Sequence, residues 1–394
     1  MKAAKTVILK RGKEQSIQRF HPWVFSGAIE KKPPGLEDGD WVMLNDSKGH
    51  TLAFGHYQDG SIAIRILSFG GSLPDEHFWH ERINKALYTR RSAGLPSTET
   101  NCYRLVHAEG DGLPGLIVDV YHDVAVIQAH SYGMHRDRTR IAEAVRDALG
   151  ASCRAIYYRA QVTLPGKKST IENEYLFATS TVPQQVSEYG CRFYVNWEEG
   201  QKTGFFIDQR ENRKLLQSFS HGKKVLNTFC YTGGFSISAL AAGAQLVHSV
   251  DASAKAISLT EDNLRLNNFD PSYHRCFAVD TFEFLSQKET DYDVIILDPP
   301  AFAKHRDARH QAVKGYQRLN TEAMKVIKPG GIIFTFSCSQ VVDRQLFYNT
   351  IVSSAIQAGR QIKVLNHLSQ PADHPVSIFH PEGEYLKGLV LFVE

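Results

Sequence analysis

The stretch KVLNTFCYTGGFSISALAAGAQLVHSVD, residues 224–251, contains the pattern that decides the fold of this chain. An apolar run at 224–229 precedes a turn with two adjacent glycines, an apolar helical segment follows at 235–242, and a second apolar run at 245–250 ends at Asp251. A strand, a helix and a second strand in this order are typical of a parallel βαβ unit. Paired glycines permit a tight turn and the close approach of a ligand to the backbone. We therefore predict a parallel α/β sheet with a ligand site after its first strand.

The same alternation continues to the end of the chain. We expect further strands at 275–279, 292–297, 331–336, 362–368 and 387–393, and helices at 254–267, 281–286, 315–327 and 343–358. Apolar strands that alternate with amphipathic helices predict a mostly parallel, doubly wound α/β sheet, a Rossmann-like fold, over residues 191–394. No helix separates the last two strands, so we expect the last strand to enter antiparallel.

Two segments of different character precede this sheet. The short apolar runs of the first segment lie at 6–10, 41–45, 52–57 and 62–67. Turns rich in glycine and proline separate these runs, which predicts a small β-barrel. The second segment mixes predicted helices and strands and is expected to form an α+β linker domain. We therefore expect three domains, at 1–72, 73–190 and 191–394.

The composition excludes several classes of protein. No apolar run approaches the roughly 18 residues of a membrane span, so we expect no membrane partner. The six cysteines form no Cys-x-x-Cys pair, and the polar N-terminus lacks the apolar core of a signal peptide, so we expect a cytoplasmic protein. None of the 17 histidines shows the spacing of metal ligands, so we expect no metal.

Basic residues dominate the first 32 positions, although the net charge of the whole chain is only +3. Lys10, Arg11 and Lys13 belong to this stretch, and Trp23 follows shortly after them. Such a segment can follow a phosphate backbone and stack on bases, so we expect it to bind RNA. A solvated basic edge strand is the alternative interpretation.

The strand ends of the predicted sheet indicate a nucleoside cofactor. The first turn lacks the Gly-x-Gly-x-x-Gly of dinucleotide folds, and no positive residue in it is placed to bind a pyrophosphate. An acid at the end of the second strand suits ribose hydroxyls. These features favour S-adenosylmethionine. The expected binding residues are Asn227, Phe229, Tyr231, Thr232, Gly233, Gly234 and Phe235 after the first strand, Asp251, Ala252 and Ser253 after the second, Asp280 and Thr281 after the third, and Asp298 and Pro299 after the fourth.

A second part of the cofactor site is expected before the sheet. Residues 200–213 combine polar and aromatic side chains in a way that would be unusual for plain surface. We interpret them as a strand-to-helix flap over the cofactor, with Lys202 and Gln209 turned inward. The alternative is an amphipathic connector held by salt bridges.

The reacting groups are predicted at the ends of two neighbouring strands. Asp298-Pro299-Pro300-Ala301-Phe302 follows one strand, and Ser337-Cys338-Ser339 follows the next. Both side chains would open onto the crevice where parallel sheets hold their ligands. We expect Cys338 to act as a nucleophile and Asp298 to bind the base. An inert buried thiol is the structural alternative.

The whole chain resembles the bacterial large-subunit rRNA cytosine-5 methyltransferases that have an N-terminal PUA domain. The matching segments are RFHPWVFSGA at 19–28, GDGLPGL at 110–116, KTGFFIDQR at 202–210, YTGGF at 231–235, DPPAF at 298–302, FSCS at 336–339 and ADHP at 372–375. The resemblance implies a PUA barrel that binds RNA, a linker domain and a class I methyltransferase domain that uses S-adenosylmethionine. It also implies that 23S rRNA is the substrate. A homodimer is a further expectation.

This resemblance implies methylation of cytosine C5 through a covalent adduct with Cys338. Ala301 stands where many cytosine-5 RNA enzymes carry a second cysteine, so the group that completes the elimination is not identified by the sequence. Two alternatives remain open. Asp-Pro-Pro-x-Phe also resembles the motif of enzymes that methylate exocyclic amines, in which an aromatic such as Phe302 stacks on the base. A non-catalytic RNA-binding factor in ribosome assembly is the other alternative.

Overall fold

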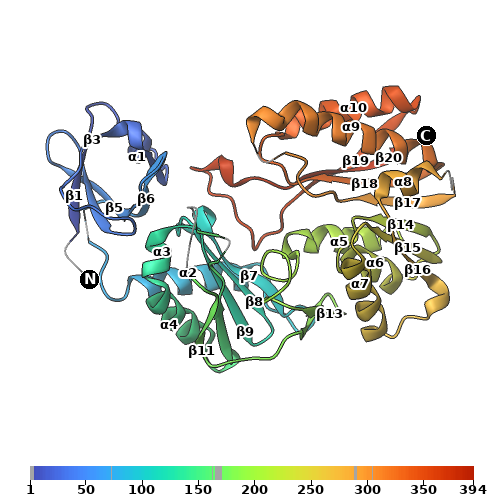
Figure 1. Cartoon of the computed structure of the whole chain (residues 1–394), viewed down its shortest axis with the longest axis horizontal. Helices are drawn as coiled ribbons and strands as arrows, with labels where there is room; N and C mark the ends of the chain where they lie inside the picture. The colour runs from blue at the N-terminus through green and yellow to red at the C-terminus, as the bar shows by residue number, and fades with distance from the viewer. Residues whose placement is uncertain (1–3, 72, 162, 165–170, 288–290, 304) are drawn as a thin grey trace. The chain divides into compact units, whose positions relative to one another are not determined.

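A computed structural model describes residues 4–71, 73–161, 163–164, 171–287, 291–303 and 305–394 (Figure 1). Contacts between residues divide the chain into two compact units. The first unit comprises Met1–Gln184, Val195–Phe205 and Ala372–Gly383, and the second comprises Gln185–Tyr194, Phe206–Pro371 and Glu384–Glu394. The chain therefore enters the first unit three times. The three-domain division stays a prediction, because this clustering places most of the two expected N-terminal domains in one unit.

The N-terminal part of the first unit is a curled six-stranded sheet with the strand order β2-β6-β5-β4-β1-β3. Its strands are β1(Lys5–Leu9), β2(Trp23–Phe25), β3(Ile29–Lys31), β4(Trp41–Asn45), β5(Thr51–Tyr57) and β6(Ile62–Phe69), and α1(Gln15–Gln18) follows β1. Alternate residues of β1 and β4, among them Val7, Leu9, Val42 and Leu44, form the buried core. The short strands β2 and β3 were not predicted, because three residues are too few to show an alternating pattern.

The rest of the first unit is built around a five-stranded sheet with the order β11-β10-β9-β8-β7. The elements are α2(Phe78–Ser92), β7(Cys102–His107), β8(Leu116–Tyr121), β9(Val124–Ala129), α3(Tyr132–Arg136), α4(Arg138–Leu149), β10(Ala155–Tyr158) and β11(Glu174–Phe177). Every residue of β8 and β9 is buried, which is expected for strands covered on both faces. Helices α2 and α4 pack against each other.

Residues of the late segment Ala372–Gly383 are anchored in this first unit by a buried ion pair. The guanidinium of Arg90 donates hydrogen bonds of 2.6 and 2.7 Å to the two carboxylate oxygens of Asp111 and one of 3.0 Å to the backbone oxygen of Asp373. The backbone N–H of Arg104 donates to the carboxylate of Asp373 at 2.9 Å. Buried charges are stable only when paired in this way, so these contacts fix the late segment to the α+β sheet.

The second unit contains the seven-stranded sheet β16-β15-β14-β17-β18-β20-β19. Its strands are β14(Lys224–Thr228), β15(Leu246–Asp251), β16(His274–Ala278), β17(Tyr292–Leu297), β18(Ile327–Ser337), β19(Ile362–Ser369) and β20(Lys387–Val393). Strands β14 to β18 pair in parallel, whereas β20 lies between β18 and β19 and is antiparallel to both. The predicted doubly wound fold and the antiparallel entry of the last strand are confirmed.

Helices connect these strands in the predicted order. They are α5(Arg210–Gln217), α6(Gly234–Ala241), α7(Ala254–Leu266), α8(Thr281–Ser286), α9(Arg309–Val326) and α10(Arg344–Ala358), and a hairpin of β12(Gln184–Glu188) and β13(Cys191–Val195) precedes them. Helix α9 begins six residues before the predicted start at Gly315. Gly315 lies inside the helix, and a Cβ atom there would be 3.0 Å from the Phe302 ring, which favours glycine at this position.

The strand order places the first strand, β14, between β15 and β17, so the sheet grows outward from β14 in both directions. In open α/β sheets a ligand binds outside the carboxyl ends of the strands at this reversal. The loops after β14, β15, β17 and β18 therefore form the expected site. Among the described residues, no helix is long and apolar enough to cross a membrane.

Candidate active site

The loop after β14 has an unusual backbone. Phe229 and Tyr231 have φ angles of 54° and 48°, and Gly233 has a φ of 76°. Bulky residues rarely adopt positive φ, and such strained conformations cluster at ligand sites. A Cβ atom at Gly233 would also lie 2.7 Å from Cγ2 of Thr260 on α7. The predicted role of this glycine in a tight turn is therefore supported by two separate constraints.

The acid at the end of β15 is fixed next to this loop. The carboxylate of Asp251 accepts hydrogen bonds from the backbone N–H groups of Tyr231 at 3.0 Å and Ser253 at 2.9 Å. Asp251 is half-buried, while Ala252 and Ser253 are exposed. A carboxylate held by two backbone donors at the mouth of a strand end can accept ribose hydroxyls without rearrangement.

The third strand end supplies an unsatisfied hydroxyl. Asp280 caps α8, and its Oδ1 accepts from the backbone N–H groups of Phe282 and Glu283 at 2.9 and 3.2 Å. The Oγ1 atom of Thr281 is buried and has no hydrogen-bond partner among the described residues. Buried hydroxyls are normally paired, so this atom is a candidate contact for a bound nucleoside. The residues present therefore fit S-adenosylmethionine, whose ribose and adenine carry the matching groups.

Several predicted cofactor residues instead support the loop from inside. The side chain of Asn227 is buried and donates to Oγ of Ser236 at 2.9 Å. The Phe235 ring packs on Phe336 with ring centres 5.6 Å apart, and Thr232 and Gly234 are also buried. The side chains of Asn227 and Phe235 thus brace α6 against the sheet, and their predicted contact with the cofactor stays a prediction.

The predicted flap at 200–213 differs from the structure in two respects. Residues 200–206 form turns and no strand, followed by η4(Ile207–Gln209) and α5. Gln209 is buried as predicted, and its Oε1 accepts from Asn212 at 2.6 Å. Lys202, in contrast, is exposed and belongs to the first unit. Its contact with the cofactor stays a prediction.

The two reacting groups lie at neighbouring strand ends, as the sequence predicts. Asp298 follows β17 and Cys338 follows β18, and these strands are paired in parallel with Leu297 opposite Thr335. Cys338 is half-buried, whereas four of the six cysteines are buried. The Oγ of Ser339 donates to the backbone oxygen of Ala303 at 2.8 Å and so ties the two loops together. The partial exposure of Cys338 at a strand end argues against an inert core thiol.

Tyr316, on α9, is a site residue that sequence reasoning missed. Burial raises the pKa of its hydroxyl to about 12, and negative charges at Cys338 and Asp298 act in the same direction. Phe302 packs on the Tyr316 ring with centres 4.7 Å apart and lies against Gly315. Phe302 is half-buried and packs at the edge of the core, and its predicted stacking on the substrate base finds no support in this packing.

Lys387, the first residue of β20, was also missed. Its side chain is only 5% exposed, and its Nζ donates to the backbone oxygens of Ser339 at 2.6 Å and Val342 at 2.7 Å, in the loop that carries Cys338. Burial lowers the pKa of Lys387 to about 8, and negative charge at Cys338 acts in the opposite direction. The only signal in the sequence is a lysine at the start of an apolar strand, which ordinarily indicates a strand end.

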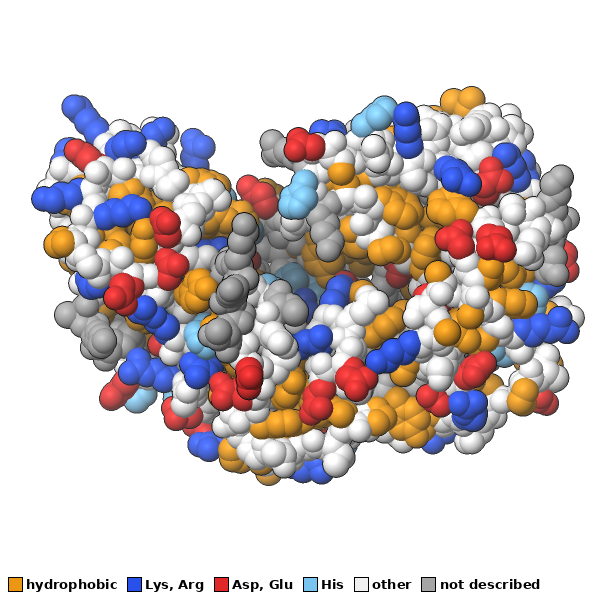
Figure 2. All heavy atoms as spheres, viewed as in Figure 1, with side chains coloured by type: hydrophobic (Ala, Val, Ile, Leu, Met, Phe, Trp, Pro, Cys, Tyr) orange, Lys and Arg blue, Asp and Glu red, His pale blue; other side chains and the backbone are white. Residues whose placement is uncertain are grey.

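The predicted RNA-binding residues lie in the first unit. Lys10, Arg11 and Lys13, which we call the basic loop, are exposed after β1, and Figure 2 shows Lys and Arg side chains over the N-terminal sheet. Trp23 is half-buried, and its Nε1 donates a hydrogen bond of 2.8 Å to the carboxylate of Glu109. The centres of the Trp23 and His380 rings are 4.3 Å apart. These contacts give Trp23 an internal role and disfavour the predicted stacking on RNA.

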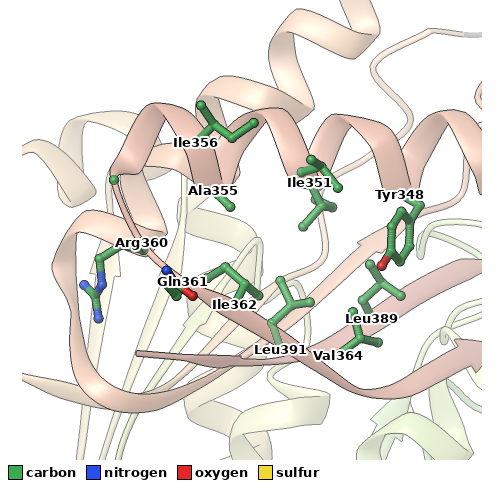
Figure 3. Close-up of a pocket in the computed structure, with 12 residues that line it drawn as sticks. Tyr348, Ile351, Ala355, Ile356, Arg360, Gln361, Ile362, Val364, Leu389 and Leu391 are labelled. Carbon is green, nitrogen blue, oxygen red and sulfur yellow. The ribbon is translucent and has the colours of Figure 1, made fainter.

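An apolar groove in the second unit is separate from these groups. It has a volume of about 350 Å³ and lies between α10 and strands β19 and β20, with Tyr348, Ile356 and Leu391 on its walls (Figure 3). The lining reaches Ile362, which pairs with Val393 at the end of β20 opposite to Lys387. The groove therefore does not belong to the site at the carboxyl ends of the parallel strands.

Comparisons with known proteins agree with this geometry. A family model described as S-adenosylmethionine-dependent methyltransferase matches residues 160–380, and a model described as PUA-like domain matches residues 7–69. Ribosomal RNA large subunit methyltransferase I of Aeromonas hydrophila is 38% identical to this chain, and the alignment covers 98% of both proteins. The protein of the same name from Tolumonas auensis is 36% identical, with 98% of both chains covered.

Solved structures show the same fold. A methyltransferase in complex with SAH superposes with a TM-score of 0.85 at 21% identity, covering 98% of this chain and all of that chain. A protein from Streptococcus mutans described as a SAM-dependent methyltransferase gives a TM-score of 0.83, also at 21% identity, with 98% of this chain and 100% of that chain covered. The methyltransferase model spans more than half of the chain, and the curated relatives align along nearly all of it. The chain therefore belongs to the S-adenosylmethionine-dependent methyltransferase family, in the group of relatives named ribosomal RNA large subunit methyltransferase I.

Proposed function

We propose that this protein methylates C5 of a cytosine in the 23S rRNA of the large ribosomal subunit, through a covalent bond between Cys338 and C6 of the base. The observation that carries this proposal is the half-buried Cys338 directly after β18, with Asp298 directly after the neighbouring parallel strand β17. The names of the relatives support rRNA as the substrate. The PUA-like segment and the exposed basic loop support RNA binding.

The chemistry of cytosine explains why a thiol is needed. C5 of cytosine is a poor nucleophile, and addition of a thiolate at C6 converts the ring into an enamine-like species whose C5 can attack. Asp298 would hydrogen-bond N3 and the exocyclic amine and stabilise the charge that develops on addition. S-adenosylmethionine, when bound, supplies an electrophilic methyl group. The target base must be unpaired or flipped out to reach such a site.

The cofactor is expected to contact the strand ends of the second unit. We propose that Asp251 accepts the ribose hydroxyls and that Thr281 contacts the adenine. The strained loop Phe229–Gly233 would follow the methionine part with its backbone, and Pro299 and Asp298 would border the transferred methyl group. The fixed carboxylate of Asp251 and the unpaired Oγ1 of Thr281 support these assignments.

Methylation of an exocyclic amine is the second candidate, because the Asp-Pro-Pro motif is shared with such enzymes. That chemistry uses no nucleophilic thiol and relies on an aromatic that stacks on the base. Here Phe302 is packed against Tyr316, and a cysteine stands at the neighbouring strand end. These two observations favour C5. A non-catalytic assembly factor is disfavoured because the thiol, the acid and the cofactor loop are all present.

Three further expectations belong to this proposal. Residues 1–72 would form the RNA-binding domain, the protein would act in the cytoplasm, and the chain would form a homodimer. Proteolysis that releases a folded fragment of 1–72, cell fractionation, and sedimentation of the purified protein would test them in turn.

Replacement of the thiol tests the proposed chemistry. Cys338→Ala should abolish methylation of 23S rRNA and leave S-adenosylmethionine affinity unchanged, because Cys338 is expected to contact the base and not the cofactor. Cys276→Ala is a matched control, because Cys276 is the other cysteine that is not fully buried. Wild-type activity in Cys338→Ala would refute the nucleophile assignment and favour amine methylation.

A further inference from the structure

We propose that Lys387 is the base that removes the C5 proton and so completes the reaction that Cys338 begins. This inference rests on the proposed function. No sequence pattern points to this group, because Lys387 is far from the methyltransferase motifs in the chain. The antiparallel insertion of β20 beside β18 places Ser337 opposite Lys387 and so brings the amine to the loop of Cys338.

The hydrogen bonds of Lys387 suit a group that gains and loses a proton. A lysine amine has two N–H donors and one lone pair, whereas the ammonium has three donors. Nζ donates to two backbone oxygens, those of Ser339 and Val342. Both contacts can be kept in either protonation state, so only the third tetrahedral position changes.

The charge on Cys338 sets the order of events. Burial lowers the pKa of Lys387 to about 8, and a thiolate at Cys338 raises it. In the free enzyme the ammonium of Lys387 can therefore stabilise the Cys338 thiolate. Once sulfur is bonded to C6 it carries no charge, so this stabilisation of the ammonium disappears. The proton of Lys387 then leaves to solvent more readily, which produces the amine when a base is needed.

The step balances as a β-elimination. After methyl transfer, C5 carries both a hydrogen and the new methyl group, and C6 is bonded to sulfur. The Lys387 amine takes the C5 proton, the C5–H electron pair forms the C5=C6 double bond, and the C6–S bond breaks to return the thiolate of Cys338. Lys387 is then an ammonium beside a thiolate, which is the starting state. General-base catalysis of this kind contributes about 10²- to 10⁴-fold to a rate.

The proposal predicts a trapped intermediate. Lys387→Met and Lys387→Arg should each form a denaturant-stable complex with 23S rRNA that contains one transferred methyl group, while turnover falls by about 10²- to 10⁴-fold. Arginine keeps the cation and its donors but does not lose a proton near neutral pH. Lys363→Met is the matched control, because Lys363 is an exposed lysine on the neighbouring strand β19.

A substrate with 5-fluorocytosine separates the steps, because fluorine at C5 cannot leave as a proton does. Wild type and both Lys387 variants should form the adduct with this RNA. Turnover of Lys387→Arg near the wild-type rate would overturn the proposal, and so would failure of Lys387→Arg to form the 5-fluorocytosine adduct when wild type does. Absence of any adduct in wild type would instead reject the proposed C5 chemistry itself.

A second inference comes from an independent group of residues in the first unit. We infer that His21, His380 and Glu382 form a binding site for a divalent transition metal such as Zn²⁺. One ligand atom of each residue lies within 4.8 Å of the others. Nε2 of His21 is 3.7 Å from Glu382, and Nδ1 of His380 is 3.2 Å from Glu382. Bonds of 2.0–2.1 Å in a tetrahedral site separate ligands by about 3.3 Å, so small side-chain rotations would suffice.

The two imidazoles are prepared to bind a metal. His380 is 2% exposed, and its Nδ1 has no hydrogen-bond partner among the described residues. Nδ1 of His21 lies 3.2 Å from both the backbone oxygen and the backbone nitrogen of Trp23. In the tautomer whose Nδ1–H donates to that oxygen, the Nε2 lone pair is available to the metal. Two imidazoles and one carboxylate are ligands that suit Zn²⁺.

Such a site would fasten the late segment Ala372–Gly383 to the N-terminal sheet, because His21 lies just before β2 and the other two ligands lie in that segment. This inference revises the sequence-based expectation that no metal is bound. Sequence spacing could not reveal the site, because its ligands come from opposite ends of the chain.

Zinc binding to the EDTA-treated full-length protein tests this site. Calorimetry should show one Zn²⁺ per chain in wild type, with affinity at least ten-fold weaker in His380→Gln and in Glu382→Gln. Zn²⁺ should also slow hydrogen exchange in residues 372–383. His122→Gln, which changes an exposed histidine between β8 and β9, should bind Zn²⁺ as wild type does. No uptake by wild type at micromolar Zn²⁺, or equal uptake by the two ligand variants, would overturn the inference.

Discussion

Substitution of Gly233 by alanine should damage the cofactor loop, and the structure gives the size of the effect. Gly233 has a φ of 76°, and an alanine in this left-handed region costs about 1–2 kcal/mol. The new Cβ would also lie 2.7 Å from Cγ2 of Thr260, and overpacking of this kind costs about 1–3 kcal/mol. We therefore expect Gly233→Ala to lower the free energy of unfolding of the second unit by about 2–5 kcal/mol.

Thr260→Ser separates the two causes. Serine removes the Cγ2 atom and keeps the hydroxyl that donates to the backbone oxygen of Tyr231 at 3.0 Å. In the double variant the overpacking should be largely relieved and the backbone strain should remain. We expect a favourable coupling energy of about 1–3 kcal/mol between the two substitutions.

Urea unfolding of the four proteins in this cycle measures the coupling. All four tryptophans lie in the first unit, so their fluorescence reports that unit and serves as an internal control, while far-UV circular dichroism also reports the second unit. S-adenosylmethionine affinity measured by calorimetry should fall in Gly233→Ala and recover in part in the double variant. Additive effects, with no coupling between positions 233 and 260, would refute the reasoning that a clash with Thr260 requires glycine.

Three other predictions concern the rest of the molecule. Glu188→Gln should lower the free energy of unfolding by about 3–5 kcal/mol. The reason is that Arg213 would stay buried without the carboxylate that now accepts its hydrogen bonds at 2.6 and 2.7 Å. A loss below about 1 kcal/mol in urea unfolding would contradict this. Replacement of Lys10, Arg11 and Lys13 by glutamine should reduce the slope of log affinity for rRNA against log salt concentration by about 2. The affinity for the cofactor should not change. An unchanged slope in filter binding would argue against RNA contact at the basic loop. Folding lowers the pKa of Lys387 from 10.5 to about 8, so between these pH values the unfolded chain binds more protons than the folded one. The free energy of unfolding of wild type should therefore rise with pH across this range relative to that of Lys387→Met. Parallel curves of unfolding free energy against pH for the two proteins would contradict this.

The fold of the second unit was predictable because its strands are long enough to show their character. Each of β14 to β18 contributes five or more residues with an apolar run, and a helix follows each of them. The antiparallel entry of β20 followed from the missing helix before it. The strands β2 and β3 and the true start of α9 were not predictable, because they depend on pairing with β6 and β1 and on the packing of Phe302 against Gly315.

The candidate site was predictable only where a residue ends a parallel strand. Asp251, Asp298 and Cys338 lie at such ends, and the carboxyl ends of parallel strands meet at one edge of the sheet. Lys387 reaches this edge of the sheet from an antiparallel strand, and Tyr316 reaches it from a helix. No local sequence pattern predicts either position. The role of Lys202 stays a prediction, because a motif shows that a residue belongs to a family and does not show which way its side chain points.

Release of hydrogen from C5 tests the central claim most directly. 23S rRNA from a strain that lacks this protein can be prepared with tritium at C5 of its cytidines and incubated with the purified protein and S-adenosylmethionine labelled in the methyl group. Methylation at C5 must replace that hydrogen, so we expect one tritium released to water for each methyl group transferred, and neither event with Cys338→Ala. Methyl transfer without release of tritium would contradict C5 methylation and show that another atom of the RNA receives the methyl group.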